Sequence, residues 1–119
     1  MIFAADLAEK VARGEKVVTR RVVKLVPNQH PSAQPCRYVV GRSYAVQPGR
    51  GKRSIARIRI VGVDQMPLGI IGADEARREG FADAVAFARR WCDLHHGIYD
   101  PATLVWRIEF ELLAEADRG

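Results

Sequence analysis

The sequence predicts a single α+β domain in which a small β-barrel, or a strongly curved mixed sheet, is covered by two to three helices. Three observations support this fold class. The chain has 119 residues, which suffice for one hydrophobic core and not for two. Apolar residues make up 48% of it, so the core needs neither metals nor disulfides to form. Segments with helical periodicity and segments with the two-residue period of strands follow one another along the chain.

The N-terminal residues predict a short extended piece followed by a helix. Ile2 and its neighbour Phe3 are typical of a short strand. Asp6 is a typical helix N-cap, Leu7 lies on the apolar face, and Gly14 is a typical helix terminator. We therefore expect an amphipathic helix that is capped by Asp6 and ends at Gly14.

Residues 17–25 are rich in valine and contain neither proline nor glycine, which predicts a strand. Because side chains alternate across a strand, Thr19 and Arg21 should share one face, whereas Lys16 and Arg20 should share the other. This strand should therefore present polar side chains on both sides of the sheet.

Two segments with clear alternation are expected to form further strands. In residues 55–63, arginines alternate with apolar side chains, and Gly62 closes the strand. In residues 104–112, arginine and glutamates alternate with leucine, tryptophan, isoleucine and phenylalanine. Each of these strands should have one buried face and one charged face.

Two helices are expected between these strands. Residues 72–79 predict a short helix that ends at Gly80. Asp83 is a typical N-cap for a longer helix that runs to His95, with Gly97 as its stop. The expected order is therefore one helix, several strands, two helices and a final long strand.

Two loops stand out for their composition. Residues 27–35 are polar and interrupted by prolines, and His30 within them is either an exposed loop histidine or a substrate contact. Residues 48–53 form a glycine-rich basic turn that lacks the pattern of a phosphate-binding P-loop. The cations of this turn either hold a nucleic-acid backbone or only keep a hairpin loop soluble; they are Arg50, Lys52 and Arg53.

Short extended pieces at 38–40 and 43–47 flank Gly41 directly before the basic turn. Tyr38 and Tyr44 lie in these pieces. Since aromatic rings close to cations stack on nucleic-acid bases, both tyrosines are candidate base-stacking residues.

The charge is distributed unevenly. The net charge is +5, but residues 1–63 hold thirteen Lys and Arg against three Asp and Glu, whereas residues 64–119 hold six against eleven. This asymmetry predicts one basic face, which favours nucleic acid or phosphate as a partner. No signal peptide or membrane span fits the sequence, so we expect a cytoplasmic protein that does not enter a membrane and is a monomer by default.

Metal and cofactor sites are not supported by the spacing of the ligand-type residues. Cys92, His95 and His96 lie close together near a helix end, but a closed zinc site needs four ligands. Cys36 and Cys92 do not suggest a disulfide framework. We expect neither a metal nor a cofactor.

Residues 14–21 are the strongest candidate site. A turn glycine is followed there by cations and a hydroxyl, at the junction of the first helix and the first strand. Such a junction can receive an anionic or nucleotide-like ligand. Alternatively, Gly14 is only a helix cap, and the cations are the solvated face of an edge strand.

The chain as a whole resembles the ASCH family, whose members have a PUA-like fold. Residues 14–21 resemble the family's Gly-x-Lys-x-x-(Glu/Thr)-x-Arg signature. Residues 41–52, which run into the 55–63 strand, and residues 106–110 carry the rest of the resemblance. It spans nearly the whole chain and implies a single domain over 1–119 with a cleft beside the signature for RNA or a nucleoside.

Some members of that family remove an acetyl group from acetylated cytidine. In those proteins a Lys, a Thr three residues later and a downstream Glu are the catalytic set. Lys16 and Thr19 match the first two by spacing, and Glu79 matches the third, with Glu75 as the alternative. The resemblance implies that Thr19 is the nucleophile or positions one, that Lys16 takes its proton, and that Glu79 orients the lysine or handles the leaving amine.

Three functional hypotheses remain open at the level of sequence. The leading one is a nucleic-acid-binding domain that holds RNA or a nucleoside in a basic cleft, with DNA not excluded. The alternatives are a nucleoside amidohydrolase and a protein-interaction module with a basic face. The expected nucleic-acid contacts are Lys16, Arg20, Arg21, Tyr44, Arg50, Lys52 and Arg53.

Overall fold

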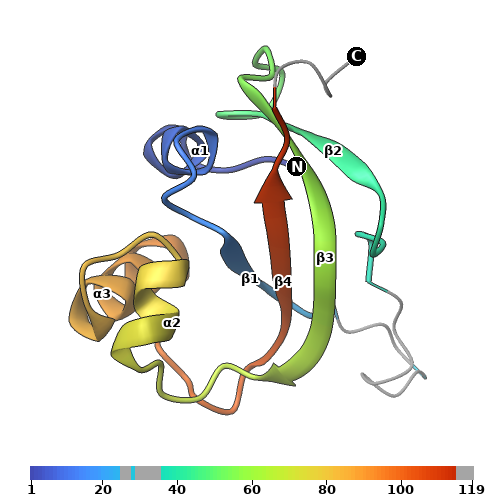
Figure 1. The fold of residues 1–119 in the computed structure, drawn as a ribbon. Helices are drawn as coiled ribbons and strands as arrows, with labels where there is room; N and C mark the ends of the chain where they lie inside the picture. Colours follow the sequence, from blue (N-terminus) through green and yellow to red (C-terminus); the bar gives the residue numbers. More distant parts are fainter. Residues whose placement is uncertain (25–27, 29–35, 115–119) are drawn as a thin grey trace.

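The computed structural model of the protein describes residues 1–24, 28 and 36–114. Within them, four antiparallel strands form one sheet in the order β1-β4-β3-β2. The sheet curls into half of a barrel, and three helices cover it (Figure 1). In chain order the elements are α1 (Ala5–Ala12), β1 (Val18–Val22), β2 (Ser43–Val46), β3 (Ala56–Pro67), α2 (Ala73–Arg78), α3 (Ala84–Leu94) and β4 (Leu104–Leu112). The predicted α+β class and the strongly curved sheet are confirmed.

The long strand β3 gives the sheet its curvature (Figure 1). The prediction that Gly62 closes this strand is wrong, because β3 pairs with β4 as far as Pro67, opposite Leu104. The register shifts between Ile60 and Gly62, which marks a bulge or irregularity. An extra residue in one strand bends it and increases its twist, so the glycine acts as a bend within the strand instead of its end.

Two apolar clusters fill the space between the sheet and the helices. The first lies under α1 and includes Ile58, Ile108 and Phe110. The second lies under α2 and α3 and includes Trp91 and Val105. Strand β4 contributes to both clusters, because its alternate side chains point to opposite faces. This strand is therefore the structural centre between the α1 side and the α2–α3 side of the molecule.

Helix α1 ends as predicted but begins differently. At its C-terminus, Gly14 has φ +76° and its N–H donates to the Val11 carbonyl, while the Glu15 N–H donates to the Lys10 carbonyl. These two bonds form a Schellman motif, which confirms the terminator. The N-cap is Ala4, and no side chain caps the helix. The prediction for Asp6 is wrong, because the helix already begins at Ala5 and leaves Asp6 in its first turn.

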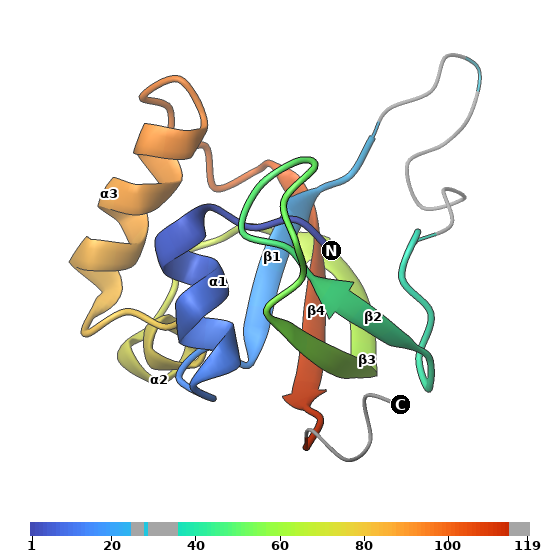
Figure 2. The same ribbon diagram turned by 90° about the horizontal axis from the view of Figure 1, so that it is seen from above.

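The displaced Asp6 has another contact. Its Oδ1 accepts a hydrogen bond at 2.8 Å from Arg90 on α3. Figure 2 shows α1 and α3 side by side on one flank of the sheet. This pair thus connects α1 and α3. The first turn of α1 and the last turn of α3 border the site described below.

Residues 38–40 do not form the expected extended piece. The Arg42 N–H donates to the Val39 carbonyl and closes a turn there, and Gly41 has φ +90°. The second piece is confirmed as β2. Strand β1 is shorter than the predicted 17–25.

The helix predictions of the second half are confirmed. Asp83 caps α3 through a hydrogen bond from the Ala86 N–H, and Gly80 and Gly97 follow α2 and α3 with φ of +96° and +77°. Residues 48–53 join β2 to β3 as a hairpin turn, in which the Lys52 N–H donates to the Gly49 carbonyl.

Some predictions fall outside the described residues, among them the loop 27–35 with His30, apart from position 28. No helix in the described part of the chain has the length and apolar character needed to cross a membrane.

Candidate functional site

The site begins where α1 passes into β1 and where α2 ends. The Val17 N–H donates to the Arg78 carbonyl at 2.8 Å, which attaches the end of α2 to the start of β1. Gly80 lies against Lys16, since a Cβ added at Gly80 would stand only 3.2 Å from the Lys16 Cβ. The positive φ and the close approach both require glycine at position 80. As a result, α2 packs directly onto the stem of Lys16.

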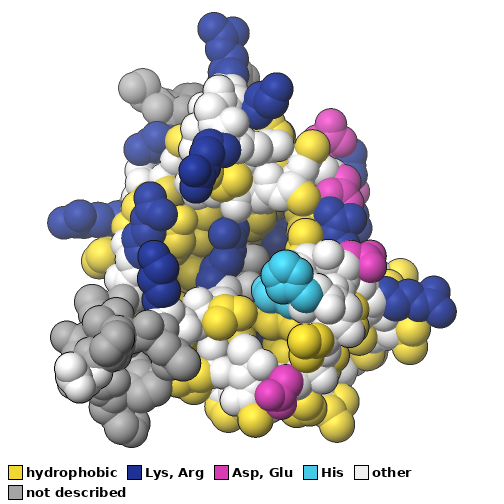
Figure 3. Space-filling model, turned by 180° about the vertical axis from the view of Figure 1, so that it is seen from behind, with side chains coloured by type: hydrophobic (Ala, Val, Ile, Leu, Met, Phe, Trp, Pro, Cys, Tyr) yellow, Lys and Arg dark blue, Asp and Glu magenta, His cyan; other side chains and the backbone are white. Residues whose placement is uncertain are grey.

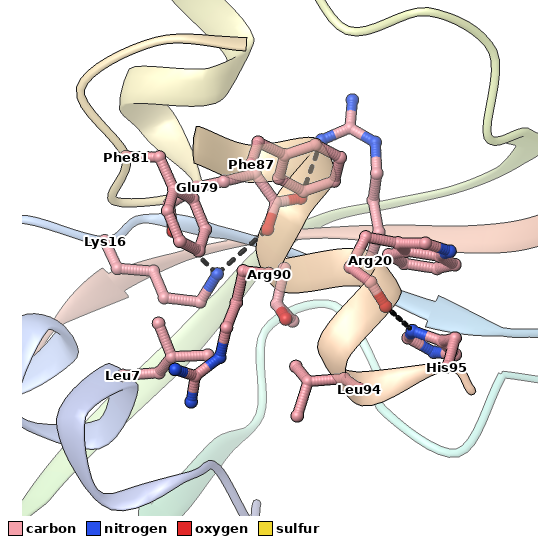
Figure 4. Close-up of a pocket in the computed structure, with 11 residues that line it drawn as sticks. Leu7, Lys16, Arg20, Glu79, Phe81, Phe87, Arg90, Leu94 and His95 are labelled. Carbon is pink, nitrogen blue, oxygen red and sulfur yellow. Dashed lines mark hydrogen bonds and ion pairs between the residues drawn. The ribbon is translucent and has the colours of Figure 1, made fainter. Parts of the chain in front are cut away.

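All three ammonium protons of Lys16 are used in hydrogen bonds. Its Nζ lies 2.9 Å from each of three acceptors: the Val18 carbonyl, the Glu79 carbonyl and Glu79 Oε1. Lys16 and Glu79 are only 2% and 3% exposed. An ammonium group has three donors, so this lysine is fully paired although it is buried. Figure 4 shows its contact with Glu79.

The remaining oxygen of Glu79 continues the pairing. Arg20 donates from Nη1 to Glu79 Oε2 and from Nη2 to Glu75 Oε1, both at 2.7 Å. Arg107 donates to the same Glu75 Oε1 at 2.6 Å. The side chains thus form a row of alternating charges, which we call the ion network: Lys16, Glu79, Arg20, Glu75 and Arg107.

Burial and pairing act in opposite directions within the ion network. Desolvation has the largest influence on Lys16 and lowers its pKa, while Glu79 raises it. The hydrogen bond from Arg107 is the main cause that lowers the pKa of Glu75 to about 2. The same bond raises the pKa of Arg107. Glu75 therefore stays ionised down to strongly acidic pH and keeps the arginines paired.

The ion network lies at the inner end of an open groove along the edge strand β1. A small cavity of about 60 Å³ adjoins Lys16 and Glu79, and the groove itself has a volume of about 530 Å³. Ligand sites commonly occupy about 300–1,000 Å³. The groove is open to solvent between the N-terminal segment and the end of α3, and both spaces share the lining residues Leu7, Thr19, Arg20, Leu94 and His95.

The groove is cationic. Among the described residues, no Asp or Glu side chain lines it, whereas Arg20 and Arg21 do. Because Arg20 is paired with Glu79 and Glu75, the positive charge that a ligand would meet comes mainly from Arg21. Arg21 is held by a hydrogen bond to the Ile2 carbonyl at 2.7 Å and lies over the Phe3 ring. Figure 3 shows a hollowed face with Lys and Arg side chains around it and histidine beside it. An anionic ligand would therefore meet favourable charge in this groove.

Thr19 lies in both the groove and the small cavity. It is 6% exposed, and its hydroxyl makes no hydrogen bond to any described residue. In particular, no hydrogen bond joins Thr19 to Lys16. The hydroxyl is thus available to a ligand or a water molecule, while the neighbouring ammonium is already saturated.

The structure brings together part of the predicted site. Lys16, Thr19 and Glu79 line the small cavity, and Arg20 and Arg21 line the groove. Glu79 is the glutamate that faces the cavity. Glu75 lies behind it, between Arg20 and Arg107.

The other predicted contacts lie outside the groove. Tyr44 packs at 5.0 Å against the Tyr38 ring and accepts a hydrogen bond from the Val39 N–H, so its ring is part of the packing around β2. The three cations of the basic turn are exposed and do not line the groove. The turn nevertheless follows Gln47, whose backbone pairs with Met1 and Phe3 in the segment that forms one wall of the groove.

His95 is a groove residue that the sequence did not assign to a ligand. Its ring stacks on Trp91 at 3.9 Å between centroids, and its Nδ1 lies 2.8 Å from the Trp91 carbonyl. This hydrogen bond requires the proton on Nδ1, which leaves Nε2 as the acceptor in the neutral ring. Four-residue spacing on a helix was the available signal, since it places both rings on one face.

No group of three or more His, Cys, Asp or Glu side chains in the described part of the chain is placed to hold a metal ion. The polar groups at the groove are arginines, a hydroxyl, an imidazole and a lysine–glutamate pair. This set suits an anionic or hydrogen-bonding organic ligand.

Comparison of the structure with solved proteins identifies several of similar fold. One is a protein from Enterococcus faecalis described under the family DUF984, with 20% identity and a TM-score of 0.61 over 91% of this chain and 70% of that one. Another is an ASCH domain from Lactobacillus crispatus, with 19% identity and a TM-score of 0.60 over 90% and 70% of the two chains. A mutant of ZmASCH from Zymomonas mobilis has 12% identity and a TM-score of 0.56 over 98% and 74%.

At the level of sequence, no family model and no curated protein matches the chain. The structural likeness is therefore one of fold: the protein has the fold of solved ASCH domains. The fold expected from the resemblance of the sequence is confirmed. Activity and ligand do not follow from likeness at this level of identity.

Proposed function

We propose that the protein binds a nucleotide unit, free or within RNA, in the groove along β1. The observation that carries this proposal is the combination of a groove of about 530 Å³ with a lining that contains arginines and, in the described chain, no acidic side chain. Apolar side chains of the N-terminal segment offer contact area for a base or sugar, and Arg21 offers charge for a phosphate.

The basic turn extends this surface. It begins next to Gln47, which pairs with the wall of the groove, and its cations are exposed. A strand of RNA that leaves the groove on this side would meet those cations through its phosphates. An RNA ligand also agrees with the cytoplasmic location expected from the sequence.

The groove can be blocked without touching the core. Val22 lines the groove and is 47% exposed, so Val22→Trp places a large ring in it. Val61 on β3 is similarly exposed (43%) and does not line the groove, which makes Val61→Trp a matched control. We expect Val22→Trp to weaken binding of a fluorescein-labelled single-stranded RNA about tenfold or more in fluorescence anisotropy, and Val61→Trp to leave it unchanged.

The same titration should be repeated at several salt concentrations and with DNA of the same sequence. Phosphate contacts predict affinity that falls as salt rises, with log Kd linear in log salt. Binding that is insensitive to salt would contradict the proposal. An equal loss of RNA affinity in Val22→Trp and Val61→Trp would contradict it as well. If RNA does not bind at all, an acidic protein partner becomes the better explanation of the basic face.

A second candidate is hydrolysis of an acyl amide on a nucleoside, and it is favoured by the geometry of Lys16, Thr19 and Glu79. The lysine–glutamate pair is buried at 2.9 Å, and the free hydroxyl of Thr19 lines the same cavity. The cavity of about 60 Å³ has apolar walls from Phe81 and its neighbours, so a short acyl group fits there while the nucleoside occupies the groove.

The chemistry requires water as the only co-reactant. Oxygen from water, or first from Thr19, adds to the acyl carbon, the carbon–nitrogen bond breaks, and the leaving amine takes up a proton. In this arrangement Lys16 is an ammonium group that donates three hydrogen bonds, so its nitrogen has no lone pair with which to accept a proton. It can act as a base only as the neutral amine, the form that burial favours by lowering its pKa.

The test is deacetylation of N4-acetylcytidine. We expect turnover to fall by about 100-fold or more in Thr19→Val, whereas Thr103→Val, outside the groove, keeps it. The thermal midpoint of Thr19→Val should stay close to that of the parent, because the hydroxyl has no partner to lose. Turnover that survives the change at Thr19 would exclude this site as the source of activity.

A further inference from the structure

Another cavity, larger than the one beside Lys16 and smaller than the groove, adjoins the groove at its N-terminal wall. It has a volume of about 160 Å³, and most of the surface that lines it is polar. The lining residues are Met1, Ile2, Arg21, Arg37, Tyr38 and Gln47. Ile2 and Arg21 line the groove as well, so the two spaces meet at these residues. A ligand at the Ile2–Arg21 end of the groove therefore lies next to this cavity, which we call the arginine pocket.

The arginine pocket contains two guanidinium groups and, in the described chain, no carboxylate. Arg37 makes no hydrogen bond or ion pair with a described residue, and its guanidinium carbon lies 5.7 Å from the centroid of the Tyr38 ring. The segment 25–35 that precedes it in the sequence contains no Asp or Glu either. This differs from the ion network, where each arginine meets a glutamate.

The two arginines also repel each other. Burial is the main cause that lowers the pKa of Arg21, and Arg37 lowers it further. Like charges that share a small space without a counter-ion cost stability. Tyr38 and Glu79 raise the pKa of Arg21 and so oppose the repulsion, but among the described residues no carboxylate lines the pocket. An anion in the pocket would remove the repulsion and satisfy free donors.

Arg21 is already oriented for such a contact. One of its five N–H donors is used by the Ile2 carbonyl, and the guanidinium lies 4.9 Å from the centroid of the Phe3 ring. A guanidinium held on a ring and a carbonyl loses little freedom when it binds an anion. Its remaining donors match the spacing of two oxygens of a phosphate group.

The size of the pocket agrees with this ligand. A volume of about 160 Å³ has room for several water molecules at about 30 Å³ each, and hence for a phosphate group with part of its hydration. A lone carboxylate would offer only two oxygens to two guanidiniums. A phosphate offers three or more, so it pairs both arginines at once.

We propose that the arginine pocket binds a phosphate group of the ligand whose base and sugar occupy the groove, so that the ligand is a phosphorylated nucleotide unit and not a free nucleoside. This inference rests on the proposed nucleotide-binding function. It adds Arg37, which the sequence did not single out, as a residue that determines specificity for the phosphate.

The test compares nucleosides with their phosphates by isothermal titration calorimetry. The probes are the four common ribonucleosides, their 5′- and 3′-monophosphates, a pentauridine RNA and inorganic phosphate. The variants are Arg37→Ala, which is safe for the fold because Arg37 is exposed, and Arg89→Ala, an exposed arginine on α3 outside both cavities.

We expect at least one monophosphate to bind about tenfold more tightly than its nucleoside. In Arg37→Ala this advantage should disappear, so that nucleotide and nucleoside bind alike, while Arg89→Ala should keep it. If pentauridine loses affinity in Arg37→Ala and the monophosphates show no advantage, the phosphate is that of an RNA backbone, and the pocket is still supported.

Other outcomes separate this inference from the function on which it rests. Nucleosides and nucleotides that bind equally well, with no effect of Arg37→Ala on any probe, would overturn the phosphate site and leave the groove intact. Binding of inorganic phosphate that depends on Arg37, without any nucleoside binding, would support the anion site and contradict the nucleotide groove. If no probe binds, both proposals fail.

Discussion

The ion network and the basic turn both concentrate positive charge, but they use it in opposite ways. In the network, Lys16 and Arg20 are 2% and 8% exposed and each contacts Glu79. In the turn, the three cations of residues 48–53 are exposed and have no ion pair with a described residue. Cations of the first kind hold elements together, whereas those of the second kind remain available to a ligand.

The difference follows from where the acidic residues come to lie. Most of them belong to the second half of the chain, and α2 brings Glu75 and Glu79 onto β1. The turn lies at the opposite end of the sheet from α2 (Figure 1). Folding therefore neutralises the basic charge of β1 at its core and leaves the turn and the groove positive.

The largest effect is expected from removal of the acid at the centre of the network. Glu79→Ala leaves two buried cations without their shared partner, so the free energy of unfolding should fall by about 3–5 kcal/mol in urea denaturation. The exposed pair Arg59–Glu111, at 3.5 Å, supplies the control, and Glu111→Ala should cost less than about 1 kcal/mol. Equal losses in the two variants would remove the distinction between buried and exposed charge.

A smaller effect is expected at acidic pH. The pKa of Glu75 is lowered from 4.5 to about 2, so its contribution is fully present above pH 4.5 and is lost as pH falls through about 2. The loss should amount to about 2–3 kcal/mol. Thermal unfolding between pH 5 and pH 2 measures it, and Glu75→Gln should flatten this part of the pH profile. An unchanged profile in Glu75→Gln would assign the acid sensitivity to other carboxylates.

Glu79→Ala is expected to act on stability. Removal of the charges of the basic turn should instead affect binding and leave stability almost unchanged. We expect the triple change of Arg50, Lys52 and Arg53 to alanine to weaken RNA binding about tenfold and to reduce the salt slope by about 2–3. The free energy of unfolding should change by less than about 0.5 kcal/mol, because these side chains are exposed. A stability loss as large as that of Glu79→Ala would show that the turn is structural.

The groove itself could be predicted in part. The clustering of Lys16, Thr19 and Arg20 was visible in the sequence, because adjacent residues at a helix-to-strand junction stay together in any fold. The family resemblance predicted Glu79, sixty-three residues after Lys16, as the partner of this lysine. Only the structure shows that the pair is buried. The sequence analysis did not assign His95 or Arg37 to the groove or its neighbouring pocket: the four-residue spacing from Trp91 to His95 was not used as a signal, and Arg37 has no periodic partner in the chain.

The sequence by itself determined the local elements of this protein. Alternation located β3 and β4, and Gly14 and Gly80 marked helix ends, because these signals depend on backbone geometry within a few residues. Only the tertiary structure decided which charges are paired and which are free. Pairing depends on how α2 and the N-terminal segment pack against β1, and such long-range contacts leave no periodic trace in the sequence.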